Sequence, residues 1–361
     1  MTGLLNSGVS LVVFLAILVG LVVAHEFGHF VVARLAGVRV HEFGIGFPPR
    51  ALKLGNDGET DYTLNWLPIG GFVRLEGEDG GSDDPRSFGR EPLPVRVAIL
   101  VAGVAMNLLL AFVIFVVIAA ALEPNADARV ETVEAGSPAA SVGIVPGDVI
   151  TAIDGHRFPY FDGQAPTSYT LAHAGDRVTL TVRTTSGATR QIPVTLNGEA
   201  AVAEGKGALG ITARIVPGAI VRRSPVQAVQ VGADRTVQAC GLILGALGQL
   251  VTSVVHNPGA APPVSGPIGI AEAVGTVRTE APPVVLLWLI GLLSANLAIV
   301  NVLPFPPLDG GRIVVSALQA VTRNRISASL ERATYFLGFM LLFGFLIWVS
   351  YFDIVRGGAG S

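Results

Sequence analysis

The first 24 residues of this 361-residue chain carry no charge, and they lead directly into the sequence His25-Glu26-Phe27-Gly28-His29. About 20 apolar residues are enough for a helix to cross a bilayer, and Phe30 to Val32 continue the apolar pattern. Ionisable side chains within a spanning segment are costly, so by default they indicate a functional site. On a helix, two histidines four residues apart share a face and can bind one Zn²⁺, with Glu26 placed as a general base.

The composition agrees with a membrane protein. Charged residues make up only 14% of the chain, against roughly 25% in soluble domains, and the mean hydropathy is +0.60. The net charge of −3 gives no case for nucleic-acid binding, and the single cysteine, Cys240, excludes an internal disulfide framework and a cysteine-based zinc site. The N-terminal apolar run lacks a basic n-region, and the histidine motif occupies the expected cleavage zone. We therefore expect a retained span rather than a signal peptide.

Four uncharged stretches are long enough to cross a membrane, at about Leu4 to the histidine motif, Val97–Leu122, Val284–Val302 and Tyr335–Phe352. A fifth apolar stretch, Ala239–Val255, is shorter and follows a polar segment from Gln227 to Gln238, so we expect it to lie at the membrane surface. Lysine and arginine are concentrated in the loops between the first two spans and between the last two. By the positive-inside rule these loops are cytosolic, and the large middle segment faces outward.

The first cytosolic loop has the pattern of a small β-sheet. Short strands are predicted at Val40–Phe47, Tyr62–Leu67 and Gly70–Leu75, with a turn at Asn56–Gly58. Two interpretations have equal weight at this point. The loop is either a plain hairpin or a strand edge near the active site that adds a strand of substrate.

The middle segment, from about Asp127 to Val216, has the composition of a soluble β-rich domain. Strands are predicted at Val130–Val133, Val149–Ile153 and Val178–Val182, with a short helix opened by Ser137-Pro138. With its G-S-P-A-A, G-D-V-I and I-D-G elements, this order resembles a PDZ domain. In that resemblance the carboxylate-binding loop corresponds to Leu209, Gly210 and Ile211.

A zinc site needs a third protein ligand and an open position for water. The remaining histidines fit surface or structural roles better; they are His41, His156, His173 and His256. Asp309 is the better candidate, although a lone aspartate at the end of a span is more often a solvated cap. The prolines before it break the helix, and broken backbone at membrane depth must be covered by protein or line a water-filled cavity. With four spans, Asp309 and the histidine motif meet at the cytosolic end; a fifth crossing would separate them.

Taken together, these motifs resemble the bacterial site-2 protease family of intramembrane zinc metalloproteases. The resemblance is carried by HExxH, F-G-I-G-F, G-G-F-V-R, the PDZ-like segment and N-x-x-P-x-P-x-L-D-G, in that order, and Ser265–Gly269 matches a further motif. It implies one catalytic zinc bound by His25, His29 and Asp309, and Glu26 as the base. Asn301, Pro304 and Pro306 would then position the substrate. The better-known enterobacterial members carry two PDZ domains, whereas this chain shows one.

The resemblance also implies partners and a location. The expected substrates are single-span membrane proteins of the anti-sigma-factor type, trimmed beforehand by another protease. The expected location is the bacterial cytoplasmic membrane, with the PDZ domain outside and the active site toward the cytosol. A catalytically silent scaffold and a zinc transporter remain as alternatives.

The fold class expected from these observations is a polytopic α-helical membrane protein with four transmembrane helices, a cytosolic-side β-strand loop and an extracytoplasmic PDZ domain. The expected division of the chain is a first span with the histidine motif (1–36), a membrane-associated strand loop (37–92), a second span (93–123), the PDZ domain (125–216), a membrane-surface helical region (217–280), a third span with the N-x-x-P-x-P-x-L-D-G motif (281–312), and a cytosolic connection with the fourth span (313–361).

Overall fold

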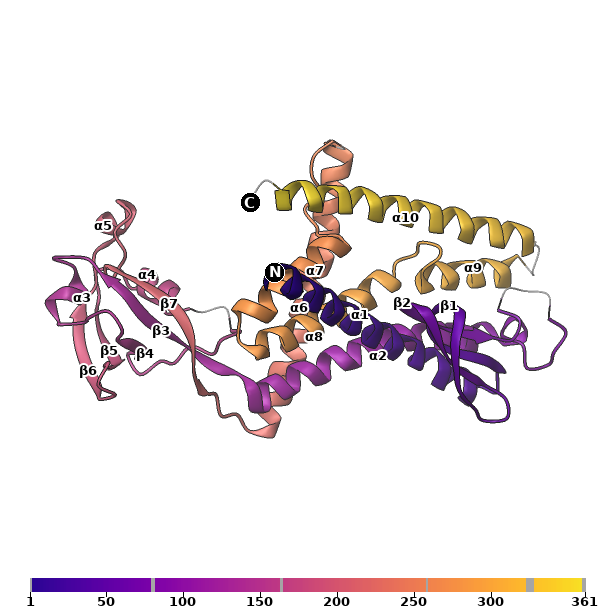
Figure 1. The fold of residues 1–361 in the computed structure, drawn as a ribbon, viewed down its shortest axis with the longest axis horizontal. Coiled ribbons are helices and arrows are strands. Elements are labelled where there is room, and N and C mark those ends of the chain that lie inside the picture. The colour runs from indigo at the N-terminus through magenta and orange to yellow at the C-terminus, as the bar shows by residue number, and fades with distance from the viewer. Residues whose placement is uncertain (1, 79–81, 163–164, 258, 323–327, 359–361) are drawn as a thin grey trace. The chain divides into compact units, whose positions relative to one another are not determined.

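The computed structural model describes residues 2–78, 82–162, 165–257, 259–322 and 328–358 (Figure 1). The chain forms two compact units. The first combines Met1–Val116 with Val231–Ser361, and the second is Val117–Gln230. The first unit holds the histidine motif, so it is the unit that positions the candidate site.

The first unit is built mainly from helices. Among the described residues, five helical segments are long and apolar enough to cross a membrane. Four of them correspond to the spans expected from the sequence. The first is Gly8–Leu35 in α1 (Thr2–Leu35), and the second is Leu93–Leu122, which begins as α2 (Leu93–Val117) and ends in the π-helical turn Ile118–Leu122. The third is Pro283–Asn301, which forms α8, and the fourth is Ser329–Arg356 in α10 (Ala328–Gly358).

The fifth candidate, α6 (Pro225–His256), differs from the sequence expectation. The polar stretch expected to precede a short apolar helix is part of the same 32-residue helix. Gly232 allows this helix to approach α2 closely, because a Cβ there would lie 2.4 Å from the Val116 side chain. By length and composition alone the count of candidate spans is therefore five rather than four.

Two shorter helices complete the first unit. The helix α7 (Pro267–Glu280) contacts α1, and Arg278 near its end donates hydrogen bonds to Ser10. The helix α9 (Asp309–Val321) follows the proline-rich loop after α8. At its start lies Asp309, which is buried.

The cytosolic loop forms two long bent strands, β1 (Val40–Asn56) and β2 (Asp61–Leu75), instead of the three short strands expected. The first half of β1 lies between the two halves of β2, and its register is antiparallel with Gly71–Leu75. The second half of β1 pairs antiparallel with the start of β2. The result is a small sheet whose edge near α1 is the Gly70–Leu75 segment. Its apolar side packs on the helices through Val40, Phe43 and Val73 against Ala33, Ile99 and Leu100.

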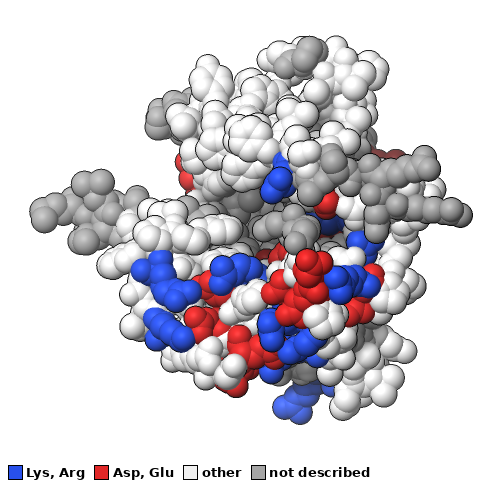
Figure 2. Space-filling model, turned by 90° about the vertical axis from the view of Figure 1, so that its right-hand side faces the viewer, with Lys and Arg blue, Asp and Glu red and all other residues white. Residues whose placement is uncertain are grey.

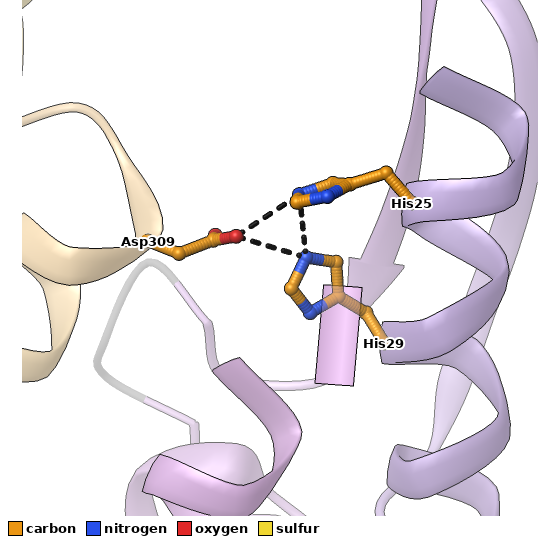
Figure 3. Close-up of side chains that lie close together, drawn as sticks. All are labelled: His25, His29 and Asp309. Atoms are coloured by element: carbon orange, nitrogen blue, oxygen red, sulfur yellow. Dashed lines mark hydrogen bonds and ion pairs between the residues drawn. The ribbon is translucent and has the colours of Figure 1, made fainter. Parts of the chain in front are cut away.

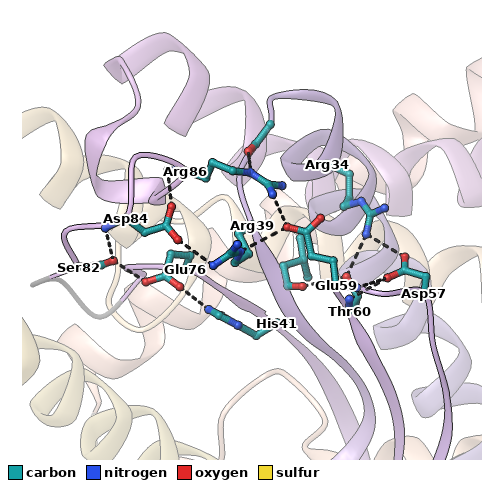
Figure 4. A network of polar contacts seen from close by, with 12 residues as sticks. Arg34, Arg39, His41, Asp57, Glu59, Thr60, Glu76, Ser82, Asp84 and Arg86 are labelled. Atoms are coloured by element: carbon teal, nitrogen blue, oxygen red, sulfur yellow. Dashed lines mark hydrogen bonds and ion pairs between the residues drawn. The ribbon is translucent and has the colours of Figure 1, made fainter.

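A network of ion pairs joins this sheet to the end of α1 and to the segment after β2 (Figure 4). Arg34 pairs with Asp57 at 2.9 Å, and Arg39 bridges Glu59 and Asp84. Backbone N–H groups of Thr60 and Glu59 donate to the Asp57 carboxylate and lower its pKa to about 2, so the turn keeps its charge down to acidic pH. Lysine, arginine and acidic side chains gather over one part of the face shown in Figure 2.

The second unit contains a five-stranded antiparallel sheet with the strand order β6-β5-β4-β3-β7. Its strands are β3 (Pro124–Val133), β4 (Val149–Ile153), β5 (Arg177–Arg183), β6 (Thr189–Thr195) and β7 (Ile211–Ile220), and its helices are α3 (Pro138–Ser141), α4 (Pro166–Ala172) and α5 (Glu199–Ala203). The expected strands lie within β3, β4 and β5. The Ser137 side chain caps α3, as its Ser-Pro sequence predicts.

Candidate metal centre

Three side chains that the sequence singled out converge in the first unit (Figure 3). His25 and His29 lie one turn apart on α1, and Asp309 is the first residue of α9. The Asp309 Oδ2 atom lies 3.0 Å from His25 Nε2 and 3.3 Å from His29 Nε2, and the two Nε2 atoms are 3.2 Å apart. All three residues are buried. The structure thus brings together segments that are 280 residues apart in the chain, as 309 less 29 gives.

These distances fit a zinc ion. Ligand atoms about 2.0–2.1 Å from a tetrahedral zinc are separated by about 3.3 Å from one another, and the three observed separations lie between 3.0 and 3.3 Å. The Asp309 Oδ2 atom is buried and has no aligned hydrogen-bond donor among the described residues. Two imidazoles and a carboxylate form a common donor set for catalytic zinc, and three protein ligands leave a fourth position open.

The face of α2 that meets the motif makes room for it. A Cβ on Gly103 would lie 2.4 Å from His29 Nε2 and 2.8 Å from His25 Cε1. A Cβ on Gly28 would lie 2.3 Å from the carbonyl oxygen of Ala102. Both glycines therefore permit the close crossing of α1 and α2. Gly103 was missed from the sequence, where it is one small residue among several in an apolar span.

Asp309 is brought to the histidines by a compact loop. The helix α8 ends at Asn301, and the loop returns the chain to α9. A Cβ on Gly310 would lie 2.1 Å from the Val302 carbonyl oxygen, and one on Gly311 would lie 2.5 Å from the Phe305 carbonyl carbon. The two glycines after Asp309 are therefore required so that the loop can fold tightly against the start of α9.

Three further residues singled out from the sequence lie in or next to this loop. Asn301 is partly exposed at the end of α8, and no side-chain hydrogen bond is formed by it within the described parts of the chain. Pro304 is exposed, whereas Pro306 packs against α10, where a Cβ on Gly338 would lie 2.0 Å from the Pro306 carbonyl oxygen. The Asn301 amide is thus available to a ligand.

The Glu26 carboxylate is held beside the sheet. Its Oε2 atom accepts a hydrogen bond of 3.1 Å from the backbone N–H of Val73 on β2. Gly71 lies next to the Glu26 side chain, since a Cβ there would be 3.7 Å from Glu26 Cγ. The Gly70–Leu75 edge of the sheet therefore lies against Glu26, the residue that follows His25.

The other histidines have different partners. His41 pairs with Glu76, and His156 stacks on Tyr169. The Nδ1 atoms of His173 and His256 each lie within hydrogen-bonding distance of a carbonyl one turn earlier. Within the described ranges, the only group of three or more residues that could hold a metal ion is His25, His29 and Asp309.

The PDZ-like loop lies in the second unit. Gly210 adopts a positive φ of 65°, and a Cβ there would lie 2.3 Å from the Ser137 Cβ. Leu209 and Ile211 line a cavity of about 290 Å³ together with α4, including Thr170 and Leu171. The lining contains no charged side chain.

Comparison with known proteins shows the family of the chain. The model of peptidase family M50 matches residues 13–345. The chain belongs to peptidase family M50. It is 34% identical to a protein of Clostridium perfringens over 93% of this chain and 95% of the relative, and 31% identical to one of Clostridium acetobutylicum over 93% and 94%; both are named putative zinc metalloproteases. It is also 29% identical to metalloprotease MmpA of Caulobacter vibrioides over 96% of each chain.

The protein is therefore a membrane metalloprotease with zinc as its cofactor. His25, His29 and Asp309 are the residues that would hold the ion. When bound, zinc supplies Lewis-acid chemistry, which polarises a carbonyl and acidifies water. If Glu26 is the base expected from the sequence, its carboxylate would accept a proton from the attacking water and pass it to the leaving amine. The backbone N–H of Val73 holds that carboxylate through a hydrogen bond.

An ion pair links the two halves of the site. The guanidinium of Arg312, three residues after Asp309, donates to Glu78 Oε1, and Glu78 Oε2 accepts from the Leu75 backbone N–H. Leu75 lies two residues beyond Val73 on β2. The pair therefore joins the helix that carries Asp309 to the strand that holds Glu26.

We expect Arg312→Gln to lower the rate of peptide hydrolysis about 10-fold, the size typical of supporting residues around a metal centre. The reason is that the strand and α9 lose their charged link, whereas no presumed ligand changes. The measurement is kcat together with zinc content for the wild type, Arg312→Gln and Arg312→Lys, which keeps the positive charge beside Glu78. A higher rate in Arg312→Lys than in Arg312→Gln supports the link, and an unchanged rate in Arg312→Gln contradicts it.

Proposed function

We propose that this protein hydrolyses a peptide bond within the transmembrane segment of single-span membrane proteins, such as anti-sigma factors. The observation that supports the proposal most strongly is the position of the triad. His25 and His29 lie within the apolar span Gly8–Leu35, and Asp309 reaches them through the loop after α8. A protease site at this depth serves substrates that are themselves in the membrane.

The sheet edge supports a way of holding such a substrate. A spanning helix hides its carbonyls, so the bond to be cut must be presented in an extended conformation. The Gly70–Leu75 segment pairs with β1 on one side, and Val73 donates to Glu26. An unwound substrate added along this edge would run beside the catalytic carboxylate. The free amide of Asn301 is a second donor for the substrate backbone or the developing oxyanion.

The contacts within the first unit support four crossings rather than five. Ser10 near the start of α1 meets Arg278, whereas His29 lies 19 residues further on, about 28 Å along the helix. Val116 lies 17 residues beyond Ile99, which contacts His29, so Val116 is at the Ser10 end. Gly232 of α6 meets Val116, so α6 also starts at that end.

The chain is at the same end again shortly after α6. Arg356 near the end of α10 donates to the Pro262 carbonyl, and Asp353 accepts from the backbone N–H groups of Gly266 and Gly269 at the start of α7. The six steps from His256 to Pro262 span at most about 22 Å, less than the roughly 30 Å of the hydrocarbon core. These contacts favour an α6 that begins and ends on the same side of the membrane, although it is long enough to cross it.

On this proposal the enzyme lies in the bacterial cytoplasmic membrane, with the second unit outside and the active site toward the cytosol. The cavity beside Leu209 and Ile211 would hold the C-terminus that a first protease exposes on the substrate, with an apolar side chain in the uncharged pocket. The alternative role for this unit is to exclude substrates with bulky ectodomains.

We expect Ile211→Glu to weaken binding of a peptide with an apolar C-terminal residue at least about 10-fold, because it places a carboxylate beside the pocket meant for another carboxylate. The measurement is peptide affinity and the cleavage of a trimmed substrate by the full-length protein. Val145→Glu, an exposed site in the same unit outside the pocket lining, is the matched control. Unchanged cleavage in Ile211→Glu would favour the exclusion role.

The experiment that tests the function itself is to map the cut in a tagged single-span substrate by mass spectrometry. A cut within the apolar stretch supports intramembrane hydrolysis. Cuts confined to the flanking soluble segments contradict it.

A further inference from the structure

One face of α2 contacts both histidines of the motif. Ile99, Gly103 and Asn107 are spaced four residues apart, so they lie above one another on the helix. The Ile99 carbonyl oxygen is 2.8 Å from His29 Nδ1, Gly103 leaves room for both rings, and the Asn107 side-chain amide is 3.3 Å from His25 Nδ1. Each histidine thus has its own polar partner on α2.

The partner of His29 fixes its tautomer. A carbonyl oxygen only accepts hydrogen bonds, so the neutral His29 ring carries its proton on Nδ1 and donates it to Ile99. The Nε2 atom is then unprotonated and faces Asp309 Oδ2. This is the form in which a histidine binds a metal, with the other ring nitrogen held by a second group.

To bind the metal through Nε2, His25 also needs a hydrogen-bond acceptor beside Nδ1, but its partner on α2 places a donor there. The atom of Asn107 nearest to His25 Nδ1 is the amide nitrogen, Nδ2, which only donates. The amide oxygen, Oδ1, is buried and is without a hydrogen-bond partner in the described structure, and the residue has no solvent exposure. A buried orphan acceptor is costly unless another state of the site uses it.

We propose that Asn107 is the positioning residue for His25 and that its Oδ1 atom accepts the His25 Nδ1 proton when zinc is bound. A half-turn of the terminal amide exchanges the two nearly isosteric ends and places the acceptor against the ring. The main chain of Asn107 does not need to move, since its carbonyl oxygen is held by the Ser294 hydroxyl at 2.8 Å. His25 is then fixed with Nε2 free for the metal, matching His29.

The proposal rests on the zinc site and not on any particular substrate, so it is tested by metal binding. In the full-length protein in detergent, we expect Asn107→Leu to weaken zinc affinity about 10- to 100-fold, measured by competition with a chromogenic chelator. Asn107→Asp keeps an acceptor and should stay within about 3-fold of the wild type. Thermal unfolding of the zinc-free proteins should show no loss of stability in Asn107→Leu, because the orphan polar group is removed.

The matched control is Ser294→Ala, which removes the hydrogen bond to the Asn107 backbone carbonyl but leaves the Asn107 side-chain amide unchanged. It should leave zinc affinity unchanged. Equal weakening by Asn107→Leu and Asn107→Asp would show a packing role only and would overturn the proposal, as would wild-type affinity in Asn107→Leu. If Asn107→Leu does not fold, Asn107→Ala, which removes the amide without adding bulk, takes its place: a similar loss of zinc affinity supports the proposal, and wild-type affinity overturns it. Failure to find a cleaved substrate would bear on the proposed function but not on these measurements.

Discussion

Replacing Gly103 with alanine should lower zinc affinity about 100-fold or more, although no presumed ligand is changed. The added Cβ would lie 2.4 Å from His29 Nε2 and 2.8 Å from His25 Cε1, far inside contact distance. The rings are buried between α1 and α2, so they can move away only by leaving the positions at which their Nε2 atoms face Asp309. The measurement is zinc content per protein after dialysis, with affinity by chelator competition.

The control for this change is Gly20→Ala on α1, where a Cβ would meet nothing within 4 Å. It introduces the same methyl group into the same apolar span as the histidines. Zinc retained at the wild-type level by Gly103→Ala would mean that α1 and α2 separate more easily than this packing allows.

Gly310→Ala should have an effect of similar size from the opposite side of the site. Its Cβ would lie 2.1 Å from the Val302 carbonyl oxygen and 2.4 Å from that of Leu303. These are backbone atoms, so the loop after α8 and the start of α9 must move apart, and Asp309 moves with α9. We expect a loss of zinc affinity of about 100-fold. A fall in turnover should accompany it, because Asn301 shifts with the same loop.

Gly344→Ala on α10 is the corresponding control, since a Cβ there also meets nothing within 4 Å. The same two measurements apply to both variants. If Gly310→Ala kept its zinc but lost turnover, the loop would position the substrate without holding Asp309 in place.

Much of this site was predictable because its ionisable residues stand out in apolar segments of the sequence. His25, Glu26 and His29 have helical spacing inside an uncharged span, and Asp309 follows a proline-rich break at the end of another. Ionisable groups are rare in such segments, so the sequence offers few other candidates for metal ligands within the membrane. The middle strands were predictable for a related reason, since their alternating apolar residues are typical of half-buried strands.

The features that were missed depend on tertiary contact. Gly103 and Asn107 are one small and one polar residue in an apolar helix, and their roles follow only from which face of α2 meets α1. The strand Gly70–Leu75 was expected as a separate short strand, but it continues β2 because a long bent strand can pair on both sides of β1. The apolar stretch Ala239–Val255 was expected to be too short to span, because the polar residues before it do not show that both stretches form one helix of 32 residues.

The most direct test of the central claim is cleavage of a tagged, single-span, anti-sigma-type substrate by purified protein in detergent, comparing the wild type with Glu26→Gln at matched zinc content. Glutamine keeps the size of the side chain and an acceptor for the Val73 N–H, but it cannot take up a proton. We expect cleavage by the wild type and a loss of at least about 100-fold in Glu26→Gln, with zinc retained. Equal cleavage by both proteins would contradict the role of Glu26 as the base, because the activity would then arise without it.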